Sequence, residues 1–342
     1  MSAGGGAGGG GRVRLAHGAG GRLTAELVGE VFAAHFGNEV LARLEDAAEV
    51  CLPGRRLAFS VDAHVVRPLF FPGGDIGRLA VCGTVNDLAA KGARPRFLSL
   101  GFVLAEGLEI EALRRVAASI AEAAAEAGVR VVAGDTKVVE STAADGVFIT
   151  SSGIGEIPEG RELAVASVRE GDRLVLTGPL AEHGLAVLDA RESLGLGASL
   201  RSDCAPLGAL AEAACAAAPG LRALRDPTRG GLAAVCLEIA AASGRRLVLE
   251  ERRLPLRPAV RAACELLGLD PLGVANEGLY LAAVAPGEAD RLVAALRAHP
   301  LGREAAVVGR VEAGPAGAEV ETEPGGRRRL AWLEGEPLPR IC

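Results

Sequence analysis

Aromatic side chains are scarce in this chain. Phe, Trp and Tyr make up 3% of its 342 residues, with one tryptophan and one tyrosine. Proteins that bind nucleic acid stack bases on aromatic side chains or carry dense basic patches. The net charge here is -6 at pH 7, and the most prominent basic run is the short stretch Arg327, Arg328 and Arg329. Nucleic acid is therefore not expected as a partner.

Long apolar runs are also missing. A membrane-spanning helix needs roughly 20 consecutive apolar residues, and no such window occurs. The N-terminus lacks the apolar core of a signal peptide. Hydrophobic residues make up 49% of the chain and charged residues 23%, which is typical of an ordinary soluble protein. These absences predict a cytoplasmic protein with no membrane association.

Cysteine pairs are the third absence. The seven cysteines are an odd number and include no C-x-x-C pair, so the sequence predicts neither a disulfide framework nor a zinc site. Six lie in or beside apolar or alanine-rich stretches and are expected to be small buried residues or inert thiols: Cys51, Cys82, Cys204, Cys215, Cys236 and Cys264.

The seventh cysteine, Cys342, follows a polar segment that contains Pro337 and Pro339. Chain ends are usually mobile, so this thiol is either the reactive end of a carrier arm or an incidental surface cysteine. Ten extended residues span roughly 33 Å, which is enough for such an arm to reach a neighbouring site.

The chain length favours two domains, because single domains usually hold about 100–200 residues. Residues 1–12 are almost all glycine and alanine and are expected to be disordered. Both halves mix predicted strands and helices without strict alternation, which indicates an α+β class. We predict an N-terminal domain over 13–160, a C-terminal domain over 161–330 and a mobile tail over 331–342.

Four acidic residues occupy positions that ordinary surfaces seldom use. Asp62 interrupts an apolar strand, Asp75 opens a helix after Pro-Gly-Gly, Asp87 lies mid-helix, and Asp135 ends a strand. Clustered carboxylates suit Mg²⁺, which usually keeps substrate phosphates in its shell. Each also has a structural alternative, such as a helix N-cap for Asp75 or a turn for Asp135. As a set they favour a metal and phosphate site.

Two glycine-rich stretches precede predicted helices, HGAGGR at 17–22 and DPTRGG at 226–231. Phosphate oxygens need backbone N–H groups that glycine allows to approach closely, and helix N-termini attract anions. Neither stretch is a Walker loop, since G-x-x-x-x-G-K-[ST] does not occur. Combined with the aspartates, the two loops favour a nucleotide site.

Six strings in this order closely resemble the HypE family of hydrogenase-maturation proteins, within the PurM-like or AIR synthetase superfamily. They are HGAGGR at 17, FFPGGDIGRLAVCGTVNDLAAKGARP at 70, GDTKVV at 134, DPTRGGLA at 226, ANEG at 275 and the terminal PRIC. The resemblance covers nearly the whole chain past residue 12. It implies a two-domain α+β fold with mixed sheets and flanking helices, and a homodimer with ATP sites near the interface.

The resemblance also implies an activity, the ATP-dependent dehydration of a carbamoyl group carried on Cys342. In the family, HypF loads that group, and the resulting thiocyanate passes to the HypC–HypD complex for the iron of NiFe hydrogenase. A thiolate suits this chemistry because sulfur both attacks an activated acyl group and later leaves. Two protons must also leave nitrogen, so a base is required.

Motif matches carry the family's metal ligands onto Asp62, Asp87 and Asp226, which would hold Mg²⁺ and through it the phosphates of ATP. The same matches make Asp75, Gly134, Asp135 and Thr136 ATP contacts.

Lys137 and Glu277 resemble the family residues near the incoming tail, so the resemblance implies proton removal or orientation of the thiocarboxamide. Their alternatives are a surface lysine and a turn glutamate. His17 is implied as a phosphate contact or a helix cap, and Arg229 as a phosphate clamp or a surface ion pair.

One departure is Ala63-His64, where the family usually has a small or hydroxyl residue and then an aromatic. His64 either replaces the aromatic contact or is a hydrogen-bonded strand histidine.

The sequence also leaves two other functions open for the whole chain. One is a different PurM-like enzyme, such as a selenophosphate or aminoimidazole ribotide synthetase, and the other is a non-catalytic carrier scaffold. Selenophosphate synthetases carry a reactive residue near the N-terminus, and residues 1–50 contain no cysteine. A scaffold need not keep a metal site.

Overall fold

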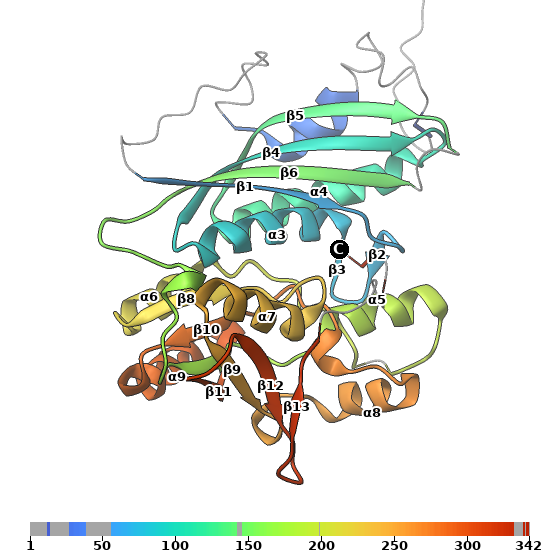
Figure 1. Ribbon diagram of the computed structural model, residues 1–342. Helices are drawn as coiled ribbons and strands as arrows, with labels where there is room; N and C mark the ends of the chain where they lie inside the picture. The colour runs from blue at the N-terminus through green and yellow to red at the C-terminus, as the bar shows by residue number, and fades with distance from the viewer. Residues whose placement is uncertain are drawn as a thin grey trace, which may run out of the picture.

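Two sheets, each with its own helices, form the molecule (Figure 1). The computed structural model describes residues 12–13, 27–38, 56–141, 146–197, 199–331, 338 and 340–341. The expected disorder of residues 1–12 falls outside this part of the chain except for Arg12, which forms an isolated β-bridge with Glu109. None of the helices in these ranges is long and apolar enough to cross a membrane.

The first sheet has four strands in the order β1-β6-β4-β5. The β4–β5 pair is parallel and the other pairs are antiparallel, so the sheet is mixed as expected. Its strands are β1 (Leu57–His64), β4 (Arg94–Ala105), β5 (Arg130–Val139) and β6 (Val147–Glu156); the hairpin β2 (Phe70–Phe71) and β3 (Gly74–Asp75) stands apart. The helical segments are η2 (Val28–Ala33), α2 (Ala34–Phe36), α3 (Ile76–Ala90) and α4 (Ile110–Ala127).

Helices α3 and α4 cover one face of this sheet (Figure 1). In α4 the buried residues Leu113, Val116, Ala117 and Ile120 recur at helical spacing, so the helix presents one apolar stripe. It ends at Gly128, whose left-handed φ of 68° makes it the C-cap that the sequence predicts. By contrast α3 is buried on nearly every side, because it lies between the sheet and the second domain.

The second sheet has seven strands in the order β13-β12-β9-β11-β7-β10-β8. Its strands are β7 (Arg173–Leu176), β8 (Leu221–Arg225), β9 (Arg246–Glu250), β10 (Leu281–Val284), β11 (Ala306–Glu312), β12 (Gly317–Glu321) and β13 (Arg327–Arg329). The helices are α5 (Glu182–Glu192), α6 (Gly208–Ala217), α7 (Gly231–Ser243), α8 (Pro258–Leu267) and α9 (Ala289–Ala298). Single turns complete it: η4 (Val165–Ser167), η5 (Glu251–Arg253), η6 (Pro271–Gly273), η7 (Pro286–Glu288) and η8 (Pro300–Gly302).

The two domains are joined by buried polar contacts beside α3. Asn86 donates through Nδ2 to the carbonyl of Ala205 at 3.1 Å and accepts the N–H of Leu207 at 2.7 Å. The chain's single tyrosine, Tyr280, donates its hydroxyl to the Asn86 carbonyl at 2.7 Å. These bonds fix the helix that carries Asp87 to the second domain.

The cysteines behave largely as expected of small buried residues. Cys82, Cys204, Cys236 and Cys264 are buried, and Cys215 is half-buried. Burial raises the pKa of the Cys236 thiol to about 12, which makes it a poor nucleophile. Cys51 and Cys342 lie outside the described residues.

Candidate functional site: an acid pocket beside a buried tail slot

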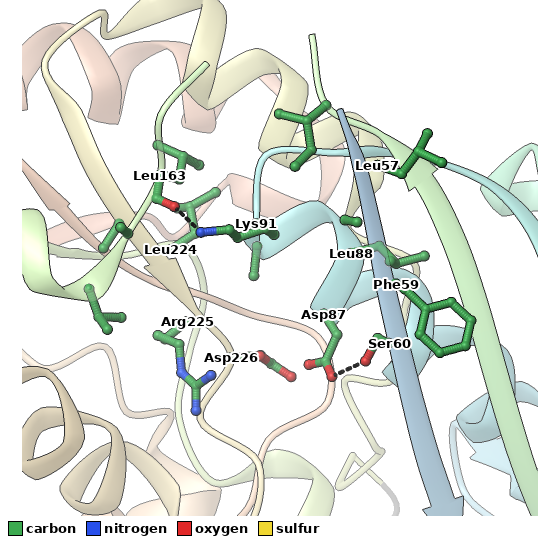
Figure 2. A pocket seen from close by; sticks show the side chains of 16 residues that line it. Leu57, Phe59, Ser60, Asp87, Leu88, Lys91, Leu163, Leu224, Arg225 and Asp226 are labelled. Carbon is green, nitrogen blue, oxygen red and sulfur yellow. Dashed lines mark hydrogen bonds between the residues drawn. The ribbon is translucent and has the colours of Figure 1, made fainter. Parts of the chain in front are cut away.

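Carboxylates from both domains converge where α3 meets the second domain. Asp62 comes from β1, Asp87 from α3 and Asp226 from the loop after β8. Figure 2 shows Asp87 and Asp226 facing each other across the pocket, next to Ser60. We call Asp62, Asp87, Asp226 and Glu277 together the acid pocket. The sequence predictions for Asp62, Asp87 and Asp226 thus fall in one place, although their metal role stays a prediction.

The alternation of β1 explains how the pocket is built. Ser60, Asp62 and His64 share the face of the strand that points at α3. The Ser60 hydroxyl donates to Asp87 Oδ2 at 2.8 Å. One turn earlier on α3, the Thr84 hydroxyl donates to Asp62 Oδ2 at 2.8 Å. A strand and a helix therefore hold two carboxylates by neutral hydroxyl donors.

The electrostatics of the pocket are unfavourable for the chain alone. Burial, and then the charge of Asp87, raises the pKa of Asp226 to about 7. Burial, and then the charge of Asp62, raises the pKa of Asp87. Arg229, which is exposed on the DPTRGG loop, opposes both shifts at Asp62 and Asp87 and so lies beside the acids.

The donor set fits a hard divalent cation that is shared with phosphates. Oxygen ligands of mutually repelling carboxylates are what Mg²⁺ prefers, and a cation would relieve the repulsion that raises their pKa values. Within the described ranges no group of three or more His, Cys, Asp or Glu side chains is arranged so that it could hold a metal ion by itself. The acids therefore suit an ion that takes its remaining ligands from substrate and water.

A cavity of about 440 Å³ opens beside the acids (Figure 2). Its polar end is Ser60, Asp87, Arg225 and Asp226, and Lys91 on its wall donates Nζ to the Leu163 carbonyl at 2.8 Å. The remaining walls are largely apolar: Leu57, Ala58, Phe59, Leu88, Ala90, Ile157, Leu163, Ala164, Val165, Ala223 and Leu224. Apolar walls with a few convergent polar groups are typical of a small-molecule site.

Glu277 is the most unusual acid of the set. It is 3% exposed, and its Oε1 has no hydrogen-bond partner within the described part of the chain. Burial, followed by the charges of Asp226 and Asp203, raises its pKa well above the usual range. Its backbone is fixed because Asp203 accepts the N–H groups of Glu277 and Gly278, each at 3.1 Å. An unpaired carboxyl of raised pKa is a suitable proton acceptor.

The DPTRGG loop is held by the ANEG segment. Asn276 donates both its backbone N–H and its Nδ2 to the Pro227 carbonyl, at 3.0 and 2.9 Å. Gly230 and Gly231 adopt φ of +76° and +60°, which turn the chain sharply into α7. Asp226 and Glu277 are therefore positioned by one interlocked pair of loops.

The GDTK group is not brought into this pocket within one chain. Gly134, Asp135, Thr136 and Lys137 lie on β5, at the opposite edge of the sheet from β1. The register aligns Asp62 with Gly134 through two intervening strands. Three strand spacings amount to about 14 Å. Their predicted ATP and catalytic roles therefore stay predictions, and Lys137 does not lie beside the acids.

Asp75 acts as the N-cap that the sequence left as an alternative. Its Oδ1 accepts the N–H of Gly77 at 2.7 Å and of Arg78 at 3.1 Å. Its expected ATP contact is a prediction that these bonds do not test. His17, the other predicted contact in the N-terminal part, lies outside the described residues.

His64 is a buried strand histidine with a hydrogen bond, as the simpler alternative predicts. Its Nε2 lies 3.1 Å from Ser151 Oγ, and Ser151 Oγ lies 2.6 Å from the Thr84 hydroxyl. Burial lowers the pKa of His64 to about 4. The residue is 5% exposed. Through Ser151 it is linked to the Thr84 hydroxyl, which donates to Asp62.

Two residues of the predicted mobile tail, 331–342, are buried: Leu338 is 5% exposed and Ile341 is 4% exposed. The Ile341 carbonyl lies 2.6 Å from His183 Nε2. Two apolar side chains in a polar segment are enough to anchor it because a matching slot exists. Cys342 itself, the predicted carrier, lies outside the described residues.

Several residues that build the site escape sequence reasoning. Ser60, Thr84, Asn86, His183 and Asp203 are single polar residues inside apolar or unremarkable contexts. One usable signal is the alternation of polar residues along β1, which puts Ser60 on the same face as Asp62. The remaining residues depend on contacts between segments far apart in the sequence.

Comparison with known proteins agrees with this geometry. Residues 44–157 match the N-terminal domain of AIR synthase related proteins, and residues 169–320 match their C-terminal domain. Carbamoyl dehydratase HypE of Rhodobacter capsulatus is 54% identical over 335 residues, 97% of this chain and 98% of the relative. The Escherichia coli K12 protein of that name is 48% identical, covering 96% and 99%.

Solved structures indicate the same family as the sequence relatives. Hydrogenase maturation protein HypE in complex with ATP is 44% identical, with a TM-score of 0.93 over 96% of this chain and 99% of the other. A HypE–HypF complex is 42% identical, with a TM-score of 0.79 over 90% and 99%. The chain belongs to the HypE family of carbamoyl dehydratases, within the AIR synthase related proteins.

Proposed function

We propose that this chain is an ATP-dependent carbamoyl dehydratase that converts a thiocarboxamide on Cys342 to a thiocyanate during hydrogenase maturation. The observation that carries the proposal is the convergence of Asp87 and Asp226, from different domains, on one cavity. The charge of Asp226 also acts on the buried Glu277, whose Oε1 has no hydrogen-bond partner among the described residues. Relatives at about half identity over nearly the full length bear that enzyme name. A structure of one family member is a complex with ATP.

The pocket supplies what the first chemical step needs. The amide oxygen is a poor leaving group until the γ-phosphoryl of ATP is transferred to it, after which it departs as phosphate. The apolar walls of the cavity suit a purine ring, and its polar end suits phosphates. Mg²⁺, when bound by Asp62, Asp87 and Asp226, would neutralise phosphate charge. Arg229 adds a positive charge beside the same acids.

Proton removal completes the balance. The nitrogen loses one proton when its oxygen is phosphorylated and a second when phosphate departs and the carbon–nitrogen triple bond forms. Glu277 is the acceptor that we assign to one of them, because its buried carboxyl has a raised pKa and an oxygen without a partner among the described residues, and the departing phosphate can accept the other. Lys137 is the second candidate, and a second copy of the chain is the source we propose for it in the site.

A homodimer would account for the exposed strand at the sheet edge. Leu57, Phe59 and Val61 on β1 are 49%, 68% and 59% exposed and alternate on one face. Large contiguous apolar surface of this kind usually marks an interface. A second copy packed there would cover the strand and bring its own residues towards the acid pocket.

The proposed partners follow from the carrier chemistry. A thiol that is loaded, dehydrated and unloaded must meet a different protein at the first and last steps. HypF is the loading partner we propose, supported by the HypE–HypF complex of a family member. The HypC–HypD complex is the acceptor that we propose from the family resemblance.

The test is mass spectrometry of the C-terminal peptide after incubation with HypF, carbamoyl phosphate, ATP and Mg²⁺. The wild-type peptide should gain a carbamoyl group and then lose one water, with one ADP formed for each water lost. Cys342→Ala should not be loaded. Loading of Cys342→Ala would refute the carrier assignment, and a loaded peptide that never loses water would refute the dehydratase assignment.

A further inference from the structure

Residues 338, 340 and 341 lie in a slot between the two domains. His183, in the first turn of α5, is fully buried and contacts the carbonyl of Ile341 through Nε2 at 2.6 Å. Phe71 of the β2–β3 hairpin meets the His183 ring edge to face, with centroids 5.5 Å apart. Leu338 reaches Gly184, where an added Cβ would lie 3.3 Å from Leu338 Cδ1. We call this set the tail slot.

Both domains hold the backbone of the tail. The Arg340 carbonyl accepts the backbone N–H of Arg67 at 3.2 Å, and also a guanidinium N–H of Arg191. Arg191 Nε donates in turn to the Arg67 carbonyl at 2.8 Å. Arg67 belongs to the first domain and Arg191 to α5, so the docked tail bridges the interface.

Hydrogen bonding and burial together set the protonation of His183. Because a carbonyl can only accept, Nε2–H donates to Ile341. Ser202 Oγ lies 2.8 Å from His183 Nδ1 and accepts the N–H of Cys204 at 3.1 Å. Burial lowers the pKa of His183 to about 4, which favours the neutral ring with the Ser202 hydroxyl donating to Nδ1.

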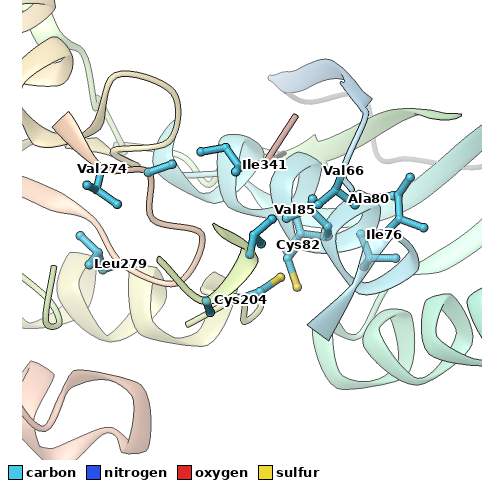
Figure 3. Close-up of a cluster of buried hydrophobic side chains, with 14 of the residues drawn as sticks. Val66, Ile76, Ala80, Cys82, Val85, Cys204, Val274, Leu279 and Ile341 are labelled. Carbon is cyan, nitrogen blue, oxygen red and sulfur yellow. The ribbon is translucent and has the colours of Figure 1, made fainter. Parts of the chain in front are cut away.

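The tail slot is tied to the acid pocket through residues 274–277. The N–H of Gly184 donates to the Ala275 carbonyl at 3.1 Å, and the N–H of Ala181 donates to Asn276 Oδ1 at 2.7 Å. Figure 3 shows Ile341 and Val274 within one apolar cluster. Glu277 follows directly in sequence. The first turn of α5 thus contacts both the end of the tail and the segment that carries the proposed base.

We propose that His183 is the positioning residue for the carrier tail, because it holds the carbonyl of Ile341, which directly precedes Cys342, and because its helix turn contacts the segment that leads to Glu277. The functional meaning rests on the proposed carrier role of Cys342, whereas the docking contact does not. His183 does not touch substrate atoms in this assignment. It acts by holding Ile341, and Ser202 Oγ contacts its other ring nitrogen.

The experiment measures how fast N-ethylmaleimide alkylates Cys342 in the full-length protein, without ATP or partner proteins. Mass spectrometry of the C-terminal peptide separates this thiol from the buried ones. His183→Leu removes the donor and should raise the rate roughly tenfold, the value of one buried hydrogen bond. His183→Gln places Nε2 at the same distance along the side chain and should stay within about twofold of wild type.

Two outcomes would overturn the proposal: an unchanged rate in folded His183→Leu, or a rate in His183→Gln as high as in the leucine variant. Ile341→Ala removes an apolar anchor and should raise the rate in wild type but add little to His183→Leu. If His183→Leu does not fold, Ser202→Ala tests the same hydrogen-bond chain and should also raise the rate. Carbamoyl loading is not measured, so failure here is distinct from failure of the carrier assignment.

Discussion

The acid pocket and the tail slot are linked by residues 274–277 and are built on opposite principles. The pocket gathers like charges whose repulsion and burial raise their pKa values. The slot gathers apolar side chains, backbone carbonyls and a neutral histidine. The Mg²⁺ and phosphates that we propose would relieve the repulsion in the pocket, whereas the polar groups of the slot are satisfied by the chain itself. Under the proposed function, the pocket binds ligands from solution and the slot holds the carrier tail of the same chain.

Glu277→Gln should impair the chemistry that we propose for the acid pocket and give the largest of the predicted effects. The amide fills the same space but cannot accept a proton, so we expect dehydration of the loaded tail to slow by about 10²- to 10⁴-fold. Single-turnover conversion of the C-terminal peptide, followed by mass spectrometry, measures this. Glu182→Gln is the matched control, since Glu182 is also buried with a pKa raised to about 7 but is bonded to Arg257 at 2.7 Å. A rate loss shared equally by both variants would contradict the assignment.

Asp226→Asn, compared with Asp172→Asn, distinguishes a carboxylate that is repelled by its neighbours from one that is paired with an arginine. We expect Mg²⁺-dependent ATP binding to weaken at least about tenfold, because one oxygen ligand loses its charge. Isothermal titration calorimetry with and without Mg²⁺ measures the difference. Asp172→Asn is the comparison: Asp172 is buried but bonded to Arg222 at 2.7 Å, so its loss should lower stability and leave ATP binding intact. Equal weakening of ATP binding without metal would argue against the ligand role.

The pH dependence of stability should follow the same contrast. The pKa of Asp226 is raised from 3.8 to about 7, so its stabilising contribution is complete below the lower value and is lost as pH rises through the higher one. The metal-free protein should therefore melt at a lower temperature at pH 8 than at pH 6. Asp226→Asn should reduce this difference. Thermal scans of both proteins, with Mg²⁺ restoring wild type at pH 8, check the sign, and an identical slope in the variant would contradict it.

Removing residues 338–342 should have the smallest effect and tests the slot. Burying Leu338 and Ile341 stabilises the chain, but ordering the backbone offsets most of the gain. A net loss of about 1 kcal/mol corresponds to a fall in Tm of roughly 2–4 °C. Leu266→Ala, at a side chain that is 76% exposed, should leave Tm unchanged. No fall on truncation would mean that the tail contributes nothing to the packing of the two domains.

Sequence reasoning predicted the acid pocket better than the slot, for a physical reason. Asp87 and Asp226 stand in motifs whose residue types already imply metal and phosphate chemistry. The slot depends on the contact of Ile341 with His183, which is 158 positions away and carries no local signal. Lys137 shows the reverse case, because its motif is strong but the register of four strands places it away from Asp62.

The fold shows the same division. Helix α4 is predictable because its apolar stripe and Gly128 are both local signals. Strands β12 and β13 are not, since the segment after Val311 is rich in glycine, proline and charge. Arg327 and Glu319 there form an ion pair at 3.5 Å, and such cross-strand pairing becomes visible only when the strands are placed side by side.

A crystal structure of the full-length protein with a non-hydrolysable ATP analogue and Mg²⁺ tests the central claim most directly. The account predicts the metal on Asp87 and Asp226, the nucleotide in the cavity lined by Leu88 and Leu224, and Ile341 still bonded to His183. It further predicts the carbamoyl oxygen of a loaded Cys342 within about 3.5 Å of the γ-phosphorus. A nucleotide bound away from these acids, or a loaded tail that ends outside the pocket, would contradict it.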